Sequence, residues 1–205
     1  MDIIPTRRNM LTVTPQDPRC VAIAGQFGDF ATFVSRWKPE RLAYITQNAD
    51  RSIEMGIPAL VMMMLTYGQE NIQEHLKLML VYAVKQMRED NIDKKDIETI
   101  ARLITESKPL RLLNYAYVIA FLGRVMQGEY ELYACKPHQF MAAFQKYAVT
   151  ARARQDLLMR QKESAEEERR WQEHRKSAIT FEEFKRRTGF KGDNPLDSLS
   201  RTGKC

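Results

Sequence analysis

The hydrophobic residues of this chain recur at spacings of three and four positions over most of residues 26–155, which is the period of an α-helix with one buried face. No stretch alternates with a period of two for long enough to indicate a sheet. The apolar stripes are Phe27, Phe30, Phe33, Val34 and Trp37; Leu42, Ile45, Ala49 and Ile53; Ile72, Leu76, Met79, Leu80, Ala83 and Met87; and Ile97, Ile100, Ala101 and Ile104. The pattern therefore predicts an all-α fold, an irregular multi-helix bundle.

Proline, glycine and capping residues indicate where these helices begin and end. Pro58 opens a segment that stays apolar on every side as far as Leu65, so it is predicted to form the most deeply buried helix. Asp93 has the position of an N-cap before the next stripe. A strongly apolar helix over 112–126 is predicted to end at Gly128.

Pro137 is predicted to open the longest helix, whose apolar stripe can pack on the core as far as Ala151. Beyond Met159 the helix is charged on all sides up to Trp171, so no core can hold it there. We expect this part to project into solvent or to meet another chain. A continuous helix over 137–176 would extend about 60 Å, because each residue adds about 1.5 Å.

Composition divides the chain into successive segments. Residues 1–25 contain several prolines without helical periodicity and are predicted to form an irregular N-terminal arm. Residues 26–155 are the predicted helical core domain and 156–178 the projecting charged helix. Residues 179–190 are predicted to form a short amphipathic docking peptide, and 191–205 have the composition of a disordered tail.

The predicted docking peptide combines a helix start with concentrated apolar groups. Thr180 and Glu183 have the spacing of a capping box, which predicts a short helical turn. Its apolar residues are Ile179, Phe181, Phe184 and Phe190. An amphipathic turn tethered behind a charged helix suits docking into a groove of a partner protein, and folding back onto the chain's own core is an equally open alternative.

The positive charge of the chain is concentrated towards its C-terminus. Residues 1–145 carry 17 positive and 16 negative charges and residues 146–205 carry 15 and 10, so the excess favours an acidic partner such as nucleic acid. The candidate phosphate contacts on the long helix are Lys146, Arg152, Arg154, Arg160 and Lys162. Because these residues do not share one stripe, a solvated face is the favoured interpretation, and any binding of DNA or RNA is predicted to be weak.

No group of residues has the spacing of a catalytic, metal or nucleotide site. His75, His138 and His174 lie far apart without a metal-spaced neighbour, which favours surface or core histidines. Cys135 beside Lys136 has no separate orienting partner, and the glycines end helices instead of forming a phosphate loop. The chain is therefore predicted to be non-enzymatic, with no metal and no cofactor.

The number and spacing of the cysteines indicate the redox state of the cellular compartment. Cys20, Cys135 and Cys205 are odd in number and widely spaced, so a reducing compartment is the simpler interpretation. No apolar run is long enough to cross a bilayer, and none has the length of a signal peptide near the N-terminus. We expect a cytoplasmic protein without a membrane partner.

In one region of the sequence an apolar helix ends in a glycine, and spaced tyrosines then precede a helix that begins with a proline. A charged helix then leads to an aromatic and acidic peptide. The matching residues are Gly128, Tyr130, Tyr133, Pro137 and Tyr147, then Thr180, Phe181, Glu182, Glu183 and Phe184. This arrangement resembles a group of uncharacterised helical proteins from phages and mobile elements of gut bacteria, although Glu131, Ala134 and Lys136 depart from the glycines and aspartate of that pattern. The group looks like replication-accessory or helicase-loader-like proteins, so the resemblance implies that role.

Two function hypotheses follow from these patterns. The first is a non-enzymatic accessory or adaptor protein of DNA replication or of a mobile genetic element, which acts through protein contacts of residues 179–190 and weak nucleic-acid contacts. The alternative is a structural or assembly protein, for example of a phage particle, that oligomerises through the charged helix Arg160–Lys176.

Overall fold

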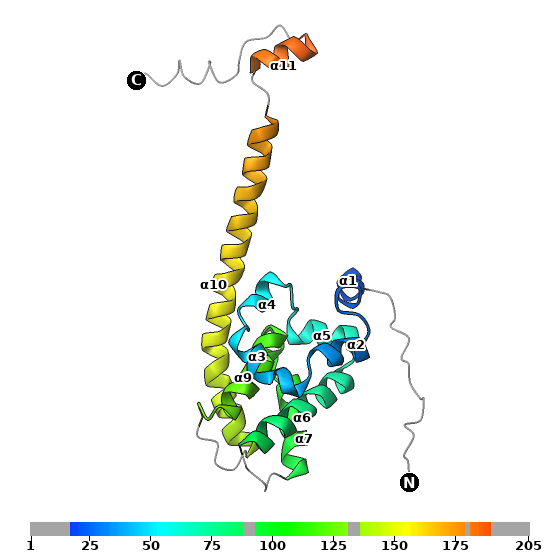
Figure 1. Ribbon diagram of the computed structural model, residues 1–205, viewed down its shortest axis with the longest axis vertical. Helices are drawn as coiled ribbons and strands as arrows, with labels where there is room; N and C mark the ends of the chain where they lie inside the picture. Colours follow the sequence, from blue (N-terminus) through cyan, green and yellow to red (C-terminus); the bar gives the residue numbers. More distant parts are fainter. Residues whose placement is uncertain (1–16, 88–92, 131–135, 179–180, 190–205) are drawn as a thin grey trace. The chain divides into compact units, whose positions relative to one another are not determined.

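A computed structural model of the chain describes residues 17–87, 93–130, 136–178 and 181–189. These residues form an all-α structure, which confirms the predicted fold class, and the only β-type pairing among them is an isolated bridge between Ala59 and Asn114 (Figure 1). The chain separates into two compact units, residues 1–160 and residues 161–205.

The first unit opens with short helices. They are α1 (Pro18–Phe27), α2 (Phe30–Arg36), the 3-10 helix η1 (Pro39–Arg41), α3 (Leu42–Gln47) and α4 (Arg51–Glu54). The prediction of an irregular arm is wrong for residues 18–25, which belong to α1. The Asp17 carboxylate caps this helix by accepting a hydrogen bond from the Arg19 backbone N–H at 2.9 Å, and Pro18 stands in the first turn, where its missing N–H costs nothing.

The stripe from Phe27 to Trp37 was predicted as one helix and is divided between α1 and α2. Gly28 has a φ of 84°, a left-handed conformation that ends α1, and Asp29 caps α2 by accepting a hydrogen bond from the Thr32 backbone N–H at 2.8 Å. Phe27 and Phe33 are buried. The apolar face was therefore predicted correctly, but the number of helices was not.

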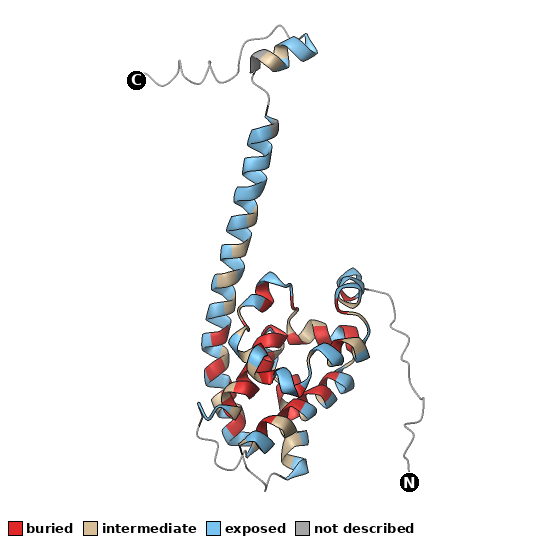
Figure 2. Cartoon of the chain, viewed as in Figure 1, coloured by how far each residue is buried: buried red, intermediate tan, exposed pale blue. Residues whose placement is uncertain are grey.

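The middle of the first unit consists of α5 (Leu60–Tyr67), α6 (Gln69–Gln86), α7 (Lys94–Glu106), α8 (Lys108–Arg111) and α9 (Tyr115–Met126). Its deepest helix is α9, which is coloured as buried over most of its length in Figure 2. Between Tyr115 and Val125, Arg124 is the only residue that is not buried. The segment Pro58–Leu65 was wrongly predicted to hold this position, because Leu65 of α5 is 62% exposed. Helix α9 packs against α3 and α6, whereas one side of the shorter α5 faces solvent.

Asn114 joins the start of α9 to its neighbours and is 3% exposed. Its Oδ1 accepts hydrogen bonds from Ser52 Oγ at 3.1 Å and from the Ala116 backbone N–H at 2.8 Å, and its Nδ2 donates to the Ile57 carbonyl at 2.5 Å. Its backbone N–H donates to Gln155 Oε1 at 2.8 Å. One buried side chain thus caps α9 and fixes the loop before α5.

His75 is a core histidine, one of the two interpretations that the sequence left open. It is 2% exposed, with Nδ1 at 2.6 Å from the Tyr115 hydroxyl and Nε2 at 2.8 Å from the Trp37 carbonyl. Because a carbonyl can only accept, Nε2 carries the proton and Nδ1 accepts from Tyr115. Burial lowers the pKa of His75, against the opposing effect of the hydrogen bond to the Trp37 carbonyl, so the neutral ring is favoured.

The first unit also includes the beginning of α10 (Pro137–Ser177). The predicted stripe of this helix is confirmed: Phe140, Phe144, Tyr147 and Ala151 are buried. The rings of Phe144 and Phe121 of α9 stack with their centroids 4.2 Å apart. Leu158 also packs against the core, three residues beyond the predicted limit of 155.

The second unit contains residues 161–177 of α10 and the helix α11 (Phe181–Thr188). The predicted short helix is present and ends at Gly189, whose φ is 70°. Every side chain described within residues 161–189 is partly or fully exposed. None of the helices in the described residues has the length and apolar character needed to cross a bilayer.

Candidate functional site

Much of the predicted docking peptide cannot be compared with the structure. Ile179 and Phe190 lie outside the described residues, as does the side chain of Phe181. Phe184 lies on α11 and is 38% exposed. On the same helix, Arg187 forms an ion pair with Glu183 at 2.7 Å. The one predicted partner-binding side chain that is described is therefore accessible to another molecule.

The predicted phosphate contacts do not behave as one set. Lys146, Arg152 and Arg160 are exposed on the first unit, and Lys162 is partly exposed on the second. Arg154 instead donates to the Asp50 carboxylate, from Nε at 3.0 Å and from Nη2 at 2.8 Å. This interaction places Arg154 in the lining of a pocket of the first unit, which the sequence pattern did not predict.

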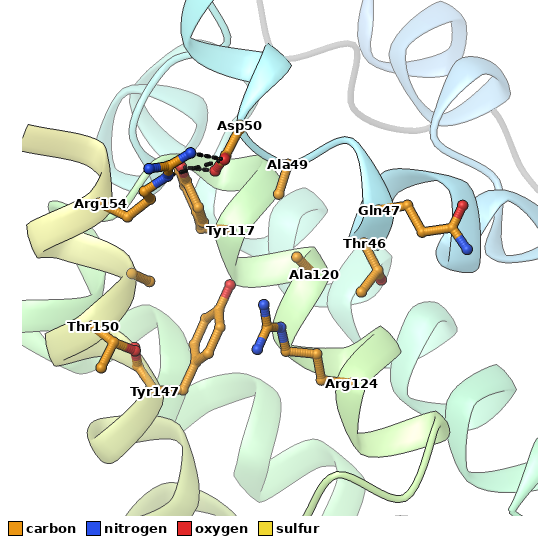
Figure 3. Close-up of a pocket in the computed structure, with 11 residues that line it drawn as sticks. Thr46, Gln47, Ala49, Asp50, Tyr117, Ala120, Arg124, Tyr147, Thr150 and Arg154 are labelled. Carbon is orange, nitrogen blue, oxygen red and sulfur yellow. Dashed lines mark hydrogen bonds and ion pairs between the residues drawn. The ribbon is translucent and has the colours of Figure 1, made fainter. Parts of the chain in front are cut away.

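The pocket lies between the end of α3, the turn that follows it, α9 and α10, and its volume is about 400 Å³ (Figure 3). It is lined by Thr46, Gln47, Ala49, Asp50, Tyr117, Ala120, Arg124, Tyr147, Thr150, Ala151 and Arg154. The three alanines leave space, while the other positions supply charged groups, hydroxyls and one amide. Together these residues form a polar cavity beside an apolar core.

Asp50 organises one side of the pocket. Its Oδ2 accepts both hydrogen bonds from Arg154, and its Oδ1 accepts one from the Tyr117 hydroxyl at 2.6 Å. Burial raises the pKa of Asp50, but the hydrogen bonds from Arg154 and Tyr117 outweigh it and leave the pKa below its usual value. Asp50 is therefore an anion whose acceptor sites are used within the protein.

The two tyrosines of the pocket remain protonated at neutral pH. Burial raises the pKa of Tyr117 well above its usual value, and the hydrogen bond to Asp50 adds to the effect. Burial also raises the pKa of Tyr147, while the nearby Arg124 acts in the opposite direction. Neither group, nor the ionised Asp50, titrates near neutrality, so the pocket is better suited to binding than to acid–base chemistry.

Arg124 and Tyr147 form the other side of the pocket. The Arg124 guanidinium carbon lies 5.4 Å from the centre of the Tyr147 ring, and Figure 3 shows the Tyr147 hydroxyl and the guanidinium directed towards each other. Arg124 Nη1 also donates to Glu129 Oε2 at 3.2 Å. The Arg124 side chain is 44% exposed to solvent, so it lies at the mouth of the pocket.

A signal for this site was present in the sequence. Tyr117 and Arg124 are seven residues apart on one helix, and Tyr147 and Arg154 are seven apart on another, so each pair lies on one helix face. Two polar faces on helices that are otherwise packed into a core indicate a polar cavity between them. Asp50 gave no such signal, because the sequence predicted a continuous helix through that position.

The chain matches no family model, and comparisons with curated proteins and with solved structures return no similar protein. Among the described residues, no three His, Cys, Asp or Glu side chains come together in a way that could hold a metal ion.

Proposed function

We propose that this protein is a non-enzymatic adaptor that binds a partner protein through α11 and the residues around it, as an accessory factor of DNA replication or of a mobile genetic element. The observation that supports the proposal is the accessibility of the second unit. No side chain described within residues 161–189 is buried, although the segment is helical and includes large aromatic groups. Trp171 is 70% exposed and Phe184 is 38% exposed.

The length of α11 adds a physical argument for docking. Isolated helices shorter than about 12 residues are marginal in water, and α11 has 8 residues. Packing of its aromatic side against a partner would stabilise the helix. The last turn of α11 contains Lys185, Arg186 and Arg187, so the expected partner surface is an apolar groove with acidic residues at its rim.

The replication or mobile-element role rests on the resemblance of Gly128–Tyr147 and Thr180–Phe184 to helical accessory proteins. Nucleic-acid contacts are a secondary part of the proposal. Arg154 is bound to Asp50, which leaves the exposed Lys146, Arg152 and Arg160 of the first unit as the better candidates. A few separated cations support weak binding to phosphates without base recognition.

The test is capture of a partner by the full-length chain and by the double variant Phe181→Ala/Phe184→Ala. Truncation of aromatic anchors commonly weakens binding by more than about 2 kcal/mol, or roughly thirtyfold, so the double variant should lose the partner and keep its melting temperature. Tyr44→Ala is the matched control, because Tyr44 is an aromatic residue of α3 with 61% exposure. A double variant that retains every partner and melts several degrees lower would contradict the proposal and favour folding back onto the core.

The exposed charged helix supports the alternative of a structural or assembly protein. Gln172 donates to Glu168 Oε1 at 3.0 Å along the surface of this helix, and Trp171 beside it offers an apolar contact for a second copy. Light scattering of the purified chain over a wide concentration range separates the two functions. A stable oligomer that Trp171→Ala dissociates would favour assembly, whereas a monomer at all concentrations would favour the adaptor.

A further inference from the structure

We propose that the pocket between α3, α9 and α10 binds a small organic anion through a phosphate or carboxylate group. This ligand site is additional to the adaptor function and lies wholly within the first unit. The proposal rests on a hydroxyl that faces the pocket without a protein partner, on guanidinium donors that two ion pairs leave unused, and on a volume suited to a small molecule.

The unpartnered donor is the hydroxyl of Tyr147. This residue is 5% exposed, and its hydroxyl points into the pocket (Figure 3). The described residues offer it no hydrogen bond, although the comparable hydroxyl of Tyr117 is bound to Asp50 at 2.6 Å. No buried side-chain polar atom of the described residues lacks a hydrogen-bond partner, so the Tyr147 hydroxyl is solvent-accessible through the pocket and is open to an acceptor on a ligand. Because the hydroxyl stays protonated, it can donate to an anion.

Arginine side chains supply further donors. Arg124 and Arg154 line the pocket, and each forms an ion pair with one carboxylate, Arg124 with Glu129 and Arg154 with Asp50. Arg154 donates hydrogen bonds to Asp50 from Nε and Nη2, and the described residues provide no acceptor for its Nη1. Arg124 donates a hydrogen bond to Glu129 from Nη1. A guanidinium has five N–H donors in a planar fork that matches carboxylate and phosphate oxygens, so both residues retain donors for a ligand.

The volume and the remaining polar groups indicate an organic ligand. About 400 Å³ is at the small end of ligand pockets and exceeds the roughly 30 Å³ share of one water molecule more than tenfold. Thr46 and Thr150 donate their hydroxyl protons to the carbonyls of Leu42 and Tyr147, at 2.7 and 2.8 Å. Their oxygens can therefore accept hydrogen bonds from hydroxyl groups of a ligand. A sugar phosphate or a hydroxylated carboxylic acid has both kinds of group.

The test is an NMR titration of the ¹⁵N-labelled full-length protein with ribose 5-phosphate, malate and inorganic phosphate, at constant ionic strength maintained with chloride. Saturable shifts should be confined to amides of α3, the turn at 48–50, and the pocket-lining parts of α9 and α10. The expected dissociation constant for the preferred organic anion is about 1 mM or lower. Preference for ribose 5-phosphate would assign the phosphate chemistry, and preference for malate the carboxylate chemistry.

Two variants and a matched control connect the binding to this pocket. Tyr147→Phe removes the unpartnered hydroxyl and keeps the ring, so it should weaken binding about tenfold without lowering the melting temperature. Arg124→Gln should weaken it at least as much. Tyr44→Phe makes the same chemical change at an exposed position outside the pocket and should leave binding unchanged.

Several outcomes would overturn the proposal. They are the absence of saturable shifts with all three anions, equal affinity of the Tyr147→Phe and Tyr44→Phe variants, and shifts spread over the exposed lysines and arginines of α10 outside the pocket. The last result would indicate charge attraction that is not specific to the cavity. None of these results bears on the adaptor function, which depends on α11.

Discussion

Asn114→Ala is the substitution expected to reveal how the first unit is held together. The amide side chain is buried and forms hydrogen bonds to Ser52, Ile57 and Ala116. An alanine fits the backbone but replaces none of these bonds. The change therefore removes the cap of α9 and leaves a buried hydroxyl and a buried carbonyl without their partner.

The magnitude follows from these separate losses. Replacing an N-cap asparagine by alanine costs about 1 kcal/mol, and each buried polar group left unsatisfied costs about 1–3 kcal/mol. Because Ser52 can rotate towards another acceptor, we expect a total loss of about 3 kcal/mol in the free energy of unfolding. At about 2–4 °C per kcal/mol for a domain of this size, the melting temperature should fall by roughly 6–12 °C.

Urea unfolding followed by tryptophan fluorescence is the appropriate assay. In a Trp171→Phe background, Trp37 is the remaining tryptophan and reports on the first unit. Asn48→Ala is the matched control, because the Asn48 amide forms one hydrogen bond, to the Tyr44 carbonyl at 2.9 Å, in an exposed setting. A loss no larger for Asn114→Ala than for Asn48→Ala would refute this account of the Asn114 network.

Further predictions concern other parts of the first unit and the role of the second. Gly25→Ala should stabilise the protein by up to about 1 kcal/mol, because Gly25 is inside α1 with nothing within 4 Å of an added Cβ. Gly123→Ala should destabilise it by about 1–3 kcal/mol, because the added methyl group would overlap with Thr46. Thermal melts of both variants would show whether the two changes in stability have opposite signs. Because the pKa of His75 is lowered from 6.5, its neutral form contributes stability that is fully present above about pH 6.5 and is lost as the pH falls below that value. This part of the pH dependence of the urea midpoint should disappear in the His75→Gln variant. A chain ending at Arg160 should melt within a few degrees of the full-length protein, since the first unit contains all the described buried residues; a fall of roughly 10 °C or more by calorimetry would show that the second unit supports it. In gel shifts, binding to DNA should be independent of sequence and decline steeply with salt, and specific binding that survives high salt would contradict the assignment of only weak phosphate contacts.

The faces of the helices could be predicted from the sequence, and the reason is simple periodicity. Ile72, Leu76, Met79 and Leu80 are all buried on α6, as their spacing required. Burial depends on which side chains share one face of a helix, and the spacing of the apolar residues in the sequence shows which side chains those are. The N-cap signal located the start of α7 correctly, because Asp93 caps it by accepting a hydrogen bond from the Lys95 backbone N–H at 3.0 Å.

Interruptions of helices could not be predicted in the same way. The stripe Leu42, Ile45, Ala49 and Ile53 is buried throughout, yet the chain leaves the helix at Asn48 and resumes it at Arg51. A short turn preserves the apolar spacing, so the hydrophobic pattern of the sequence is the same with or without the turn. Tertiary contacts decide the break, and these involve residues distant in sequence, such as Arg154, which is 104 positions from Asp50.

The interruptions and the candidate site have a common physical origin. Where α3 ends, the turn at 48–50 places the Asp50 carboxylate against α9 and α10, next to residues that are otherwise apolar or aromatic. The Asp50 side chain is 46% exposed, and its two oxygens accept hydrogen bonds from Tyr117 and Arg154. These donors extend from two packed helices, and the small side chains Ala49, Ala120 and Ala151 prevent the helices from filling the space between them. The polar residue at this helix interruption therefore has polar partners on the two neighbouring helices, and those partners line the same cavity as Tyr147 and Arg124.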